Sequence, residues 1–312
     1  MDMTCVFKGH FAAAVKALRL LVLVCAGLFW LATGNAAEVR WKGDFEAGLP
    51  SIAGTSGADF SKKLYDEGTN AEADVESLAG MGICGNPREG LFSGRTSVLE
   101  GGSGVRVRAE IKSHLPGTYK FDWDGPEYWI GISFCLAEWP KGSDAHTFLQ
   151  LHSPNEESGS NCDFEGNALT IGVVNDTANI RVLDNPSGIS EGGAAQANNK
   201  IVYTYNLRDT LGQWQDFVFR FHLNTKGNGY YTAWHNGRQV ASESGLVNVN
   251  WKDSCGNVIA KSYHNGLHLG IYGGPNNAGP KTLYLDSAKI AEGSNGYDLV
   301  APGGGSQVPR PN

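Results

Sequence analysis

Short runs in which apolar and polar residues alternate recur along this chain, and this periodicity most constrains its fold. Alternation with a period of two places one face of a strand in a core and the other face outside it. Gly, Asn, Asp and Pro, which are typical of turns, separate the runs. The runs are VRVRAEIKS, YWIGISFCL, HTFLQLHS, ALTIGVV, NIRVLD, IVYTYNL, WQDFVFRFHL, GYYTAWHNGRQV, LHLGIYG and KTLYLDSAKI. Many short strands with few helical patterns predict an all-β sandwich or jelly roll.

Turn chemistry and composition predict the organisation around these strands. The pair Asn236–Gly237 between two strand-like pieces indicates a hairpin turn. Segment 51–80 is rich in Gly, Ser, Ala and acidic residues, so we expect loops with one short helix. Residues 301–312 are rich in Gly and Pro and predict a flexible tail. Without an internal repeat or linker, residues 38–300 are expected to form a single β-jelly-roll domain.

The N-terminal segment has the pattern of a secretory signal peptide. Lys8, Lys16 and Arg19 precede the apolar run 20–34, and small residues follow it. We expect residues 1–37 to be the signal peptide, with cleavage near Ala36 or Ala37. The alternative is an uncleaved anchor, because the uncharged stretch 20–37 is at the lower limit of what spans a bilayer. Cleavage predicts a secreted or periplasmic protein that leaves the membrane.

The charge balance excludes one class of partner. The chain has 25 Lys and Arg against 32 Asp and Glu, and removal of residues 1–36 takes away three basic groups and Asp2, which leaves 22 − 31 = −9. Nonspecific nucleic-acid binding needs a basic surface, so nucleic acid is not an expected partner. An anionic substrate is still compatible with the composition, because a groove is often locally basic on an acidic protein.

Four cysteines remain after the apolar N-terminal run. They are Cys84, Cys135, Cys162 and Cys255. An even number in an exported chain predicts two disulfides, for which three connectivities exist. The spacing does not match a zinc site.

Three of the alternating runs carry long polar groups on their second face. In VRVRAEIKS these groups are Arg106, Arg108, Glu110 and Lys112. In HTFLQLHS they are Gln150 and His152, which are expected to share a face with Phe148. In LHLGIYG, the face consists of His268, Gly270 and Tyr272. Such a face is either solvated and self-paired, or the floor of a groove for an extended ligand. The alternation of side chains between the two faces of a strand (parity) does not by itself separate these alternatives.

The same residues resemble the motifs of a known enzyme group. RAEIK (Arg108–Lys112) resembles the R-[ST]-E-L-R motif of the alginate lyases of polysaccharide lyase family seven, QLH (Gln150–His152) their Q-[IV]-H motif, and GIY (Gly270–Tyr272) the end of their Y-F-K-A-G-x-Y motif. WKGDFEAG, EYWIGISFCLAEWP and GQWQDFVFRFHL are similar to the heparin lyase I-like and glucuronan lyase branch. The resemblance covers residues 41–290 in order. His268 replaces the lysine of the alginate lyases, which leaves the substrate open.

The resemblance implies both a fold and an activity. The fold is a concanavalin A-like β-sandwich with a concave groove. The activity is that of a polysaccharide lyase that cleaves a uronic-acid-containing chain, of glucuronan, alginate or heparin-like type, by β-elimination to unsaturated uronate products. We expect a monomer that binds an anionic polysaccharide and requires no cofactor, with room for a structural calcium ion.

Elimination explains why these residue types are needed. The proton on C5 becomes acidic only when donors or positive charge neutralise the neighbouring carboxylate. Arg108 and Gln150, with His268 beside them, are the expected substrate-binding residues. Tyr272 and His152 are the expected catalytic residues. In a syn elimination Tyr272 takes the C5 proton and returns one to the leaving oxygen; in an anti elimination His152 is the base and Tyr272 the acid.

Several features keep alternatives open. Trp123 and Trp129 either stack on sugar rings or pack in the core. FDWDGPE (121–127) and NDTAN (175–179) either hold calcium or form turns. The rival functions are a noncatalytic lectin-like sandwich and a sandwich glycoside hydrolase. The hydrolase needs a pair of carboxylates, but the closest pattern, NCDFE (161–165), begins with Asn161 instead of an acid.

Overall fold

The computed structural model describes most of the chain after residue 35. The described residues are 36–46, 60–64, 71–77, 82–98, 106–113, 120–142, 145–152, 162, 166–190, 198–260, 262–275 and 279–303. The chain divides into two units at residue 36, and the account below concerns the second, 37–312. The expected signal peptide and C-terminal tail lie outside the described residues, except for 36–37 and 301–303. Within the described part, none of the helices has the length and apolar character needed to cross a membrane.

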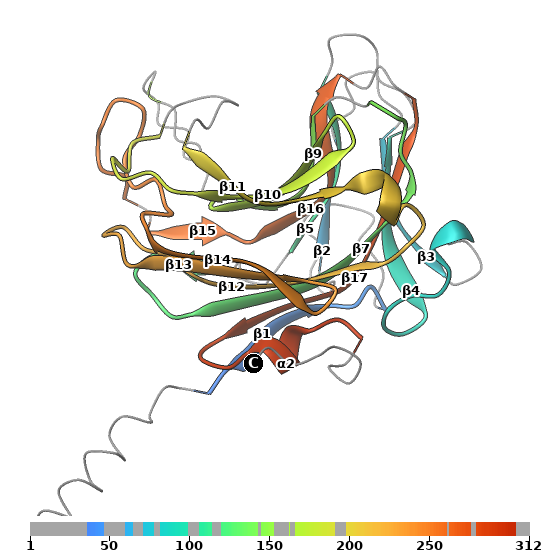
Figure 1. Ribbon diagram of the computed structural model, residues 1–312, viewed down its shortest axis with the longest axis horizontal. Helices are drawn as coiled ribbons and strands as arrows, with labels where there is room; N and C mark the ends of the chain where they lie inside the picture. Colours follow the sequence, from blue (N-terminus) through green and yellow to red (C-terminus); the bar gives the residue numbers. More distant parts are fainter. Residues whose placement is uncertain are drawn as a thin grey trace, which may run out of the picture. The chain divides into compact units, whose positions relative to one another are not determined.

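Antiparallel strands form two large sheets (Figure 1). The larger has the order β14-β13-β12-β7-β17-β4-β3, and β1 pairs with β17 at its side. Its strands are β1 (Glu38–Gly43), β3 (Ala71–Ser77), β4 (Phe92–Val98), β7 (Tyr128–Glu138), β12 (Gln215–His222), β13 (Gly229–His235), β14 (Arg238–Leu246) and β17 (Lys281–Glu292).

The second sheet has seven strands in the order β11-β10-β9-β8-β16-β5-β2. Its strands are β2 (Phe60–Leu64), β5 (Arg106–Ser113), β8 (His146–Leu151), β9 (Leu169–Val174), β10 (Thr177–Leu183), β11 (Asn199–Asn206) and β16 (Leu267–Pro275). Outside these two sheets lie the pair β6 (Lys120–Asp122) and β15 (Tyr263–Asn265) and the short helices η2 (Gly82–Cys84), η3 (Leu207–Thr210) and α2 (Tyr297–Val300). The predicted all-β sandwich is confirmed.

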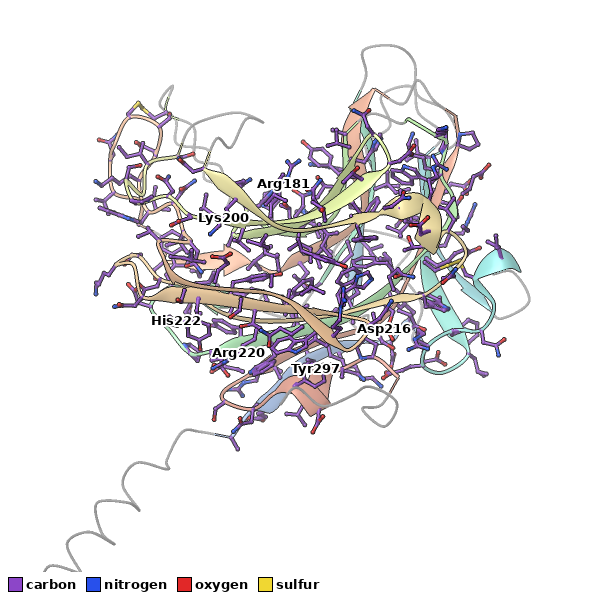
Figure 2. All side chains as sticks on the ribbon, in the orientation of Figure 1. Arg181, Lys200, Asp216, Arg220, His222 and Tyr297 are labelled. Carbon is purple, nitrogen blue, oxygen red and sulfur yellow. A yellow bond between two sulfur atoms is a disulfide. The ribbon has the colours of Figure 1, made fainter. Side chains whose placement is uncertain are left out.

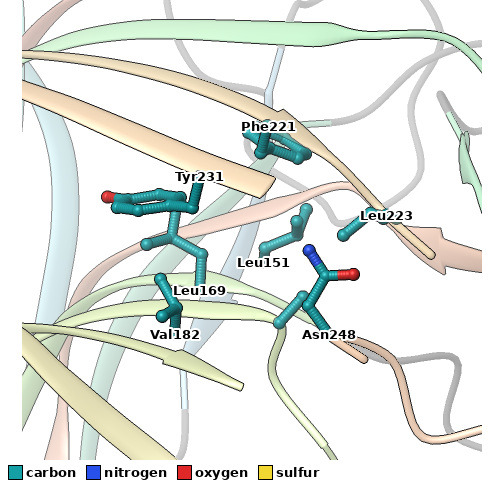
Figure 3. Close-up of a pocket in the computed structure, with 8 residues that line it drawn as sticks. Leu151, Leu169, Val182, Phe221, Leu223, Tyr231 and Asn248 are labelled. Atoms are coloured by element: carbon teal, nitrogen blue, oxygen red, sulfur yellow. The ribbon is translucent and has the colours of Figure 1, made fainter. Parts of the chain in front are cut away.

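The core lies between the two large sheets, and the alternation in the sequence explains how it forms. Side chains fill this space in Figure 2. Ala109 and Ile111 of β5 are fully buried there, as are the apolar residues of β16. Figure 3 shows one place where the sheets meet, with Leu169 and Val182 on one side and Phe221 and Tyr231 on the other. An apolar interior of this kind stabilises the sandwich but offers few polar groups to a ligand.

All ten runs predicted as strands are strands, and one segment predicted as loops contains strands as well. The ten alternating runs form β5, β7 to β14, β16 and β17. The prediction of loops with one short helix for segment 51–80 is wrong where the structure describes it, because β2 and β3 lie there. Their sequences, FSKKL and AEADVES, have few of the β-branched and aromatic residues that favour strands.

The predicted hairpin turn is confirmed at Asn236–Gly237. Both residues have positive φ, 47° and 77°, as the tight turn between β13 and β14 requires. Asn175 and Asp176 form a similar turn between β9 and β10, with φ of 48° and 66°.

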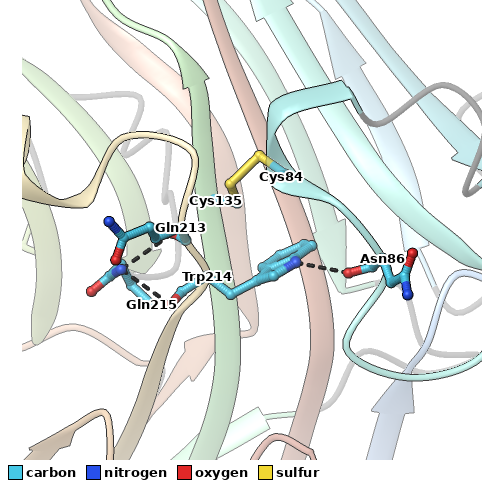
Figure 4. The surroundings of a disulfide bond; sticks show 6 residues. All are labelled: Cys84, Asn86, Cys135, Gln213, Trp214 and Gln215. Atoms are coloured by element: carbon cyan, nitrogen blue, oxygen red, sulfur yellow. Dashed lines mark hydrogen bonds between the residues drawn. A yellow bond between two sulfur atoms is a disulfide. The ribbon is translucent and has the colours of Figure 1, made fainter.

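Two disulfides settle the connectivity that the sequence left open. Cys84 pairs with Cys135, and Cys162 pairs with Cys255. Figure 4 shows the first bond, which ties η2 to β7. Nearby, the Trp214 indole N–H donates to the Asn86 carbonyl at 2.9 Å, which anchors the same segment a second time.

Candidate active site

The polar residues selected from the sequence lie on the outer face of the seven-stranded sheet, the side opposite the core. On β16, Leu267, Leu269 and Ile271 are buried in the core, so His268 and Tyr272 point the other way. The same argument places Arg108 and Glu110 of β5 and Gln150 of β8 on that outer face.

Strand register brings these residues together from three adjacent strands. Tyr272 pairs with Arg108, and His268 pairs with both Lys112 and Gln150. Residues paired across antiparallel strands have their side chains within contact distance of one another. The three segments therefore meet at one place, although they are far apart in the sequence.

Gly270 lies at the centre of this arrangement, opposite Glu110. Its φ is +137°, and a Cβ at this position would lie 2.2 Å from the carbonyl oxygen of Ala109. Only glycine fits such a backbone. The register between β16 and β8 shifts at this point, between Leu269 and Tyr272.

Glu110 is the hub of the cluster, and it is only 1% exposed. Its Oε1 accepts a hydrogen bond of 2.6 Å from Gln150 Nε2, and its Oε2 lies 3.0 Å from Arg108 Nε. His268 Nδ1 lies 3.9 Å from the same Oε2. Asn167 Nδ2 donates to Gln150 Oε1 at 3.0 Å, which fixes the orientation of that amide. One N–H of Gln150 is therefore engaged within the protein.

The two residues expected to be catalytic lie at opposite ends of this hub. The guanidinium of Arg108 is 4.0 Å from the centre of the Tyr272 ring. The ring of His152 stacks on His268 at 4.3 Å with an interplanar angle of 20°. Tyr272 and His152 are half-buried, whereas Arg108, Gln150 and His268 are buried. The cluster thus presents a phenol and an imidazole above a buried polar layer.

Sequence reasoning gave no site role to two members of the cluster and misplaced a third residue. Glu110 lies two positions after Arg108 and therefore on the same face of the strand, and this spacing could have identified it. Asn167 belongs to a different segment and gave no signal. Phe148 was expected on the face of Gln150 but lies in the core. The cause is a shift in register between Thr147 and Leu149, which adds one residue to β8 and turns Phe148 inward.

The tryptophans proposed for sugar stacking are both in buried clusters. Trp123 is in the main core, and Trp129 stacks on Trp234 at 5.9 Å in a smaller cluster beside α2. Core packing is therefore the correct alternative for both residues.

The segments considered for calcium form turns whose carboxylates have protein partners. Asp176 accepts from Arg208 Nε and Nη2 at 3.0 and 2.7 Å. Asp124 accepts from the backbone N–H and the hydroxyl of Thr225 at 3.0 and 2.7 Å. Both carboxylates thus have protein partners in these turns, and the structural calcium ion stays a prediction.

A buried arginine and amide beneath a tyrosine and a histidine can hold an anion and move a proton beside it. On a two-sheet antiparallel sandwich, this set is compatible with an enzyme that acts on an anionic carbohydrate. The family model described as polysaccharide lyase matches residues 88–289, which is more than half of the chain. The chain belongs to this polysaccharide lyase family and is a lyase.

Solved structures of other proteins have a similar fold. The endo-β-1,4-glucuronan lyase from the fungus Trichoderma reesei is similar with a TM-score of 0.55 and 16% identity, over 85% of this chain and 99% of that one. Alginate lyase A1-II', of polysaccharide lyase family seven, has a TM-score of 0.43 and 13% identity over 64% and 80%. The cellulose-induced protein Cip1 has a TM-score of 0.42 and 15% identity, over 80% of this chain and 96% of that one. No curated protein sequence matches the chain.

Proposed function

We propose that this lyase cleaves a uronic-acid-containing polysaccharide by β-elimination, with glucuronan as the first substrate to test. The observation that carries the proposal is the cluster around Glu110, which links Arg108, Gln150 and His268 beneath the half-buried side chains of Tyr272 and His152. In such a reaction the C5 proton leaves, a C4=C5 double bond forms, and the C4–O bond breaks as the leaving oxygen gains a proton.

In this proposal Arg108 and Gln150 stabilise the charge that develops on the substrate carboxylate. Positive charge and amide donors act best where they are preorganised and shielded from water. Both side chains are held by Glu110 and are less than 10% exposed.

The choice of glucuronan rests on likeness, and its stereochemistry, which mannuronate shares, is compatible with a single proton-transferring group. In glucuronate the C5–H and C4–O bonds lie on the same face of the ring, so a single group can take one proton and return it to the leaving oxygen. Thr147 is the β8 residue paired with Tyr272, and His152 follows it by five positions. Because the register shift at Phe148 adds one residue to β8, this corresponds to about 13 Å along the strand. The separation favours Tyr272 in both roles, and the glucuronan lyase is the structure similar over 99% of its length.

We further propose that the enzyme is exported, by the secretory or periplasmic route, and acts as a monomer on its polysaccharide. Its two disulfides support export, because such bonds persist in oxidising compartments.

The test is the absorbance of the unsaturated uronate product, measured separately with glucuronan, alginate and heparin. With the active polymer, Tyr272→Phe is expected to lower kcat about 10²–10⁴-fold while substrate binding is retained, because only the proton-transferring hydroxyl is lost. His152→Ala distinguishes the two mechanisms. It spares most of kcat if Tyr272 serves both roles, and lowers kcat as far as Tyr272→Phe does if His152 is the base.

Tyr230→Phe is the matched control, because Tyr230 also lies beneath a guanidinium, that of Arg220 at 4.9 Å, on the other sheet. It should leave turnover unchanged. Binding without product absorbance in the wild-type protein would indicate a lectin, and release of reducing ends without that absorbance a hydrolase. Either result contradicts the proposal.

A further inference from the structure

The polar face of the seven-stranded sheet continues beyond the cluster, across β9 and β10. Gln150 of β8 pairs with Thr170 of β9, and Thr170 pairs with Arg181 of β10. Adjacent strands lie about 4.8 Å apart, so Arg181 is about 10 Å across the sheet from Gln150. An extended pyranose chain advances by close to one strand spacing per sugar, so this distance corresponds to a sugar near the cleaved bond.

Arg181 points to the same outer face as the cluster. Its neighbours Ile180 and Val182 are buried in the core, so the arginine side chain leaves β10 on the opposite side, away from the eight-stranded sheet (Figure 2). The side chain is half-buried, and its Nε is buried without a hydrogen-bond partner.

The pairing of Arg181 differs from that of comparable arginines. Arg208 pairs with Asp176, and Arg220 pairs with Glu127. Among the described residues, no carboxylate forms an ion pair with Arg181. A charged donor that is shielded from water and lacks a partner is costly, and a bound carboxylate relieves that cost with a planar, two-point contact.

Asn179 adds a second unpartnered group on the same face. It precedes Arg181 by two positions, is 3% exposed, and its Oδ1 is buried with no hydrogen-bond partner. Gly172 of β9 pairs with Asn179 on one side and with Thr147 of β8 on the other. A Cβ at Gly172 would lie 3.0 Å from the carbonyl oxygen of His146 and 3.8 Å from both Asn179 Oδ1 and Thr147 Oγ1, so these two side-chain oxygens lie on either side of the glycine on this face.

These two oxygens adjoin the cluster, because Thr147 also pairs with Tyr272. An arginine suits a carboxylate, and an amide oxygen suits the hydroxyl of a ligand. A hexuronate carries both groups on one ring.

We propose that Arg181 and Asn179 form a second uronate-binding subsite, which holds a sugar of the same chain about two units from the one at Gln150. Arg181 binds its carboxylate, and Asn179 accepts from one of its hydroxyls. This inference rests on the proposed function and extends it: the enzyme requires acidic sugars at more than one position.

Oligouronates of increasing length test the subsite. Arg181→Gln should raise KM about 10- to 100-fold for oligomers long enough to reach β10, with little change in kcat, because the contact lies away from the reacting bond. The shortest oligomer that is cleaved should show no change. Asn179→Ala should produce a smaller rise in KM with the same dependence on length.

Arg40→Gln, a change to a half-exposed arginine of β1 in the other sheet, is the matched control and should leave KM unchanged. An unchanged KM for long oligomers with Arg181→Gln would overturn the inference, as would an equal rise for short and long ones.

Binding calorimetry separates this inference from the proposed function. If the wild-type protein forms no unsaturated product from any uronate polymer, the proposed function fails, yet calorimetry with a long oligouronate still tests the subsite. The wild type should then bind about 10- to 100-fold more tightly than Arg181→Gln. Equal affinities would reject the subsite.

Discussion

Glu110 shows how much of this site depends on one buried side chain. It contacts Arg108, Gln150 and His268 at once, and none of these contacts involves an exposed group. A carboxylate in this position holds the arginine and the amide in one geometry, and catalysis depends on such preorganisation. Its contribution is to position its neighbours, because its two oxygens are directed into the protein.

Glu110→Gln should therefore lower kcat at least about tenfold while KM changes less. The substitution keeps the shape but removes the charge that pairs with Arg108, and places an N–H where one acceptor oxygen was. Steady-state kinetics measure the effect. Glu243→Gln is the control, because Glu243 pairs with Lys200 on partly exposed strands. A matching loss in both variants, or a loss in the melting temperature alone, would contradict the positioning role.

The sequence predicted which residues meet at the site better than it predicted how they interact. Parity placed Arg108, Gln150, His268 and Tyr272 on one face, because each strand has a fully apolar opposite side. It failed at Phe148, because a shift in register reverses parity without leaving a mark in the sequence. Side-chain partners such as Asn167 depend on loops that alternation does not describe.

At the level of elements, β16 depends on Gly270. Its backbone has a φ of +137°, and a Cβ there would lie 2.2 Å from the carbonyl oxygen of Ala109, so a side chain fits only if the two strands separate. β16 is central to the sheet, since it pairs with both β5 and β8. Separation of these strands would also move Glu110 away from its partners.

Gly270→Ala is expected to destabilise the protein by about 2–4 kcal/mol and to lower activity in the remaining folded fraction. Gly142→Ala is the control, because Gly142 also has positive φ, 67°, but has nothing near its Cβ position. It should cost only about 1 kcal/mol, the backbone part of the effect. Urea unfolding measures both variants, and equal losses would show that steric contact with β5 is unimportant.

At the scale of the whole molecule, His235 joins the two sheets. It lies on β13, and its Nδ1 accepts from the hydroxyl of Tyr203 on β11 at 3.1 Å. Its Nε2 donates to Gln215 Oε1 at 2.8 Å, and its ring stacks on Phe217 at 4.4 Å. Burial, with a smaller effect from Arg238, lowers the pKa of His235 from 6.5 to about 4.

This histidine makes stability depend on pH in a defined direction. Its folded pKa is below the unfolded value, so the unfolded chain binds a proton first as the pH falls from 6.5 towards 4. Stability is then lost over that range. Asp286 acts in the opposite direction, because burial raises its pKa to about 6 and the folded state takes up the proton first. These two groups therefore contribute to the acid stability of the sandwich with opposite signs.

Replacing the histidine separates the two contributions. In the wild-type protein the free energy of unfolding contains a His235 contribution of about 2 kcal/mol that is present at pH 7 and mostly absent at pH 4.5. His235→Gln removes that contribution and leaves the effects of the other titrating groups, including Asp286, in place. Urea unfolding at both pH values should show that the variant loses less stability on acidification than the wild type. An identical pH dependence in the two proteins would mean that protonation of this inter-sheet contact does not govern how the sheets separate in acid.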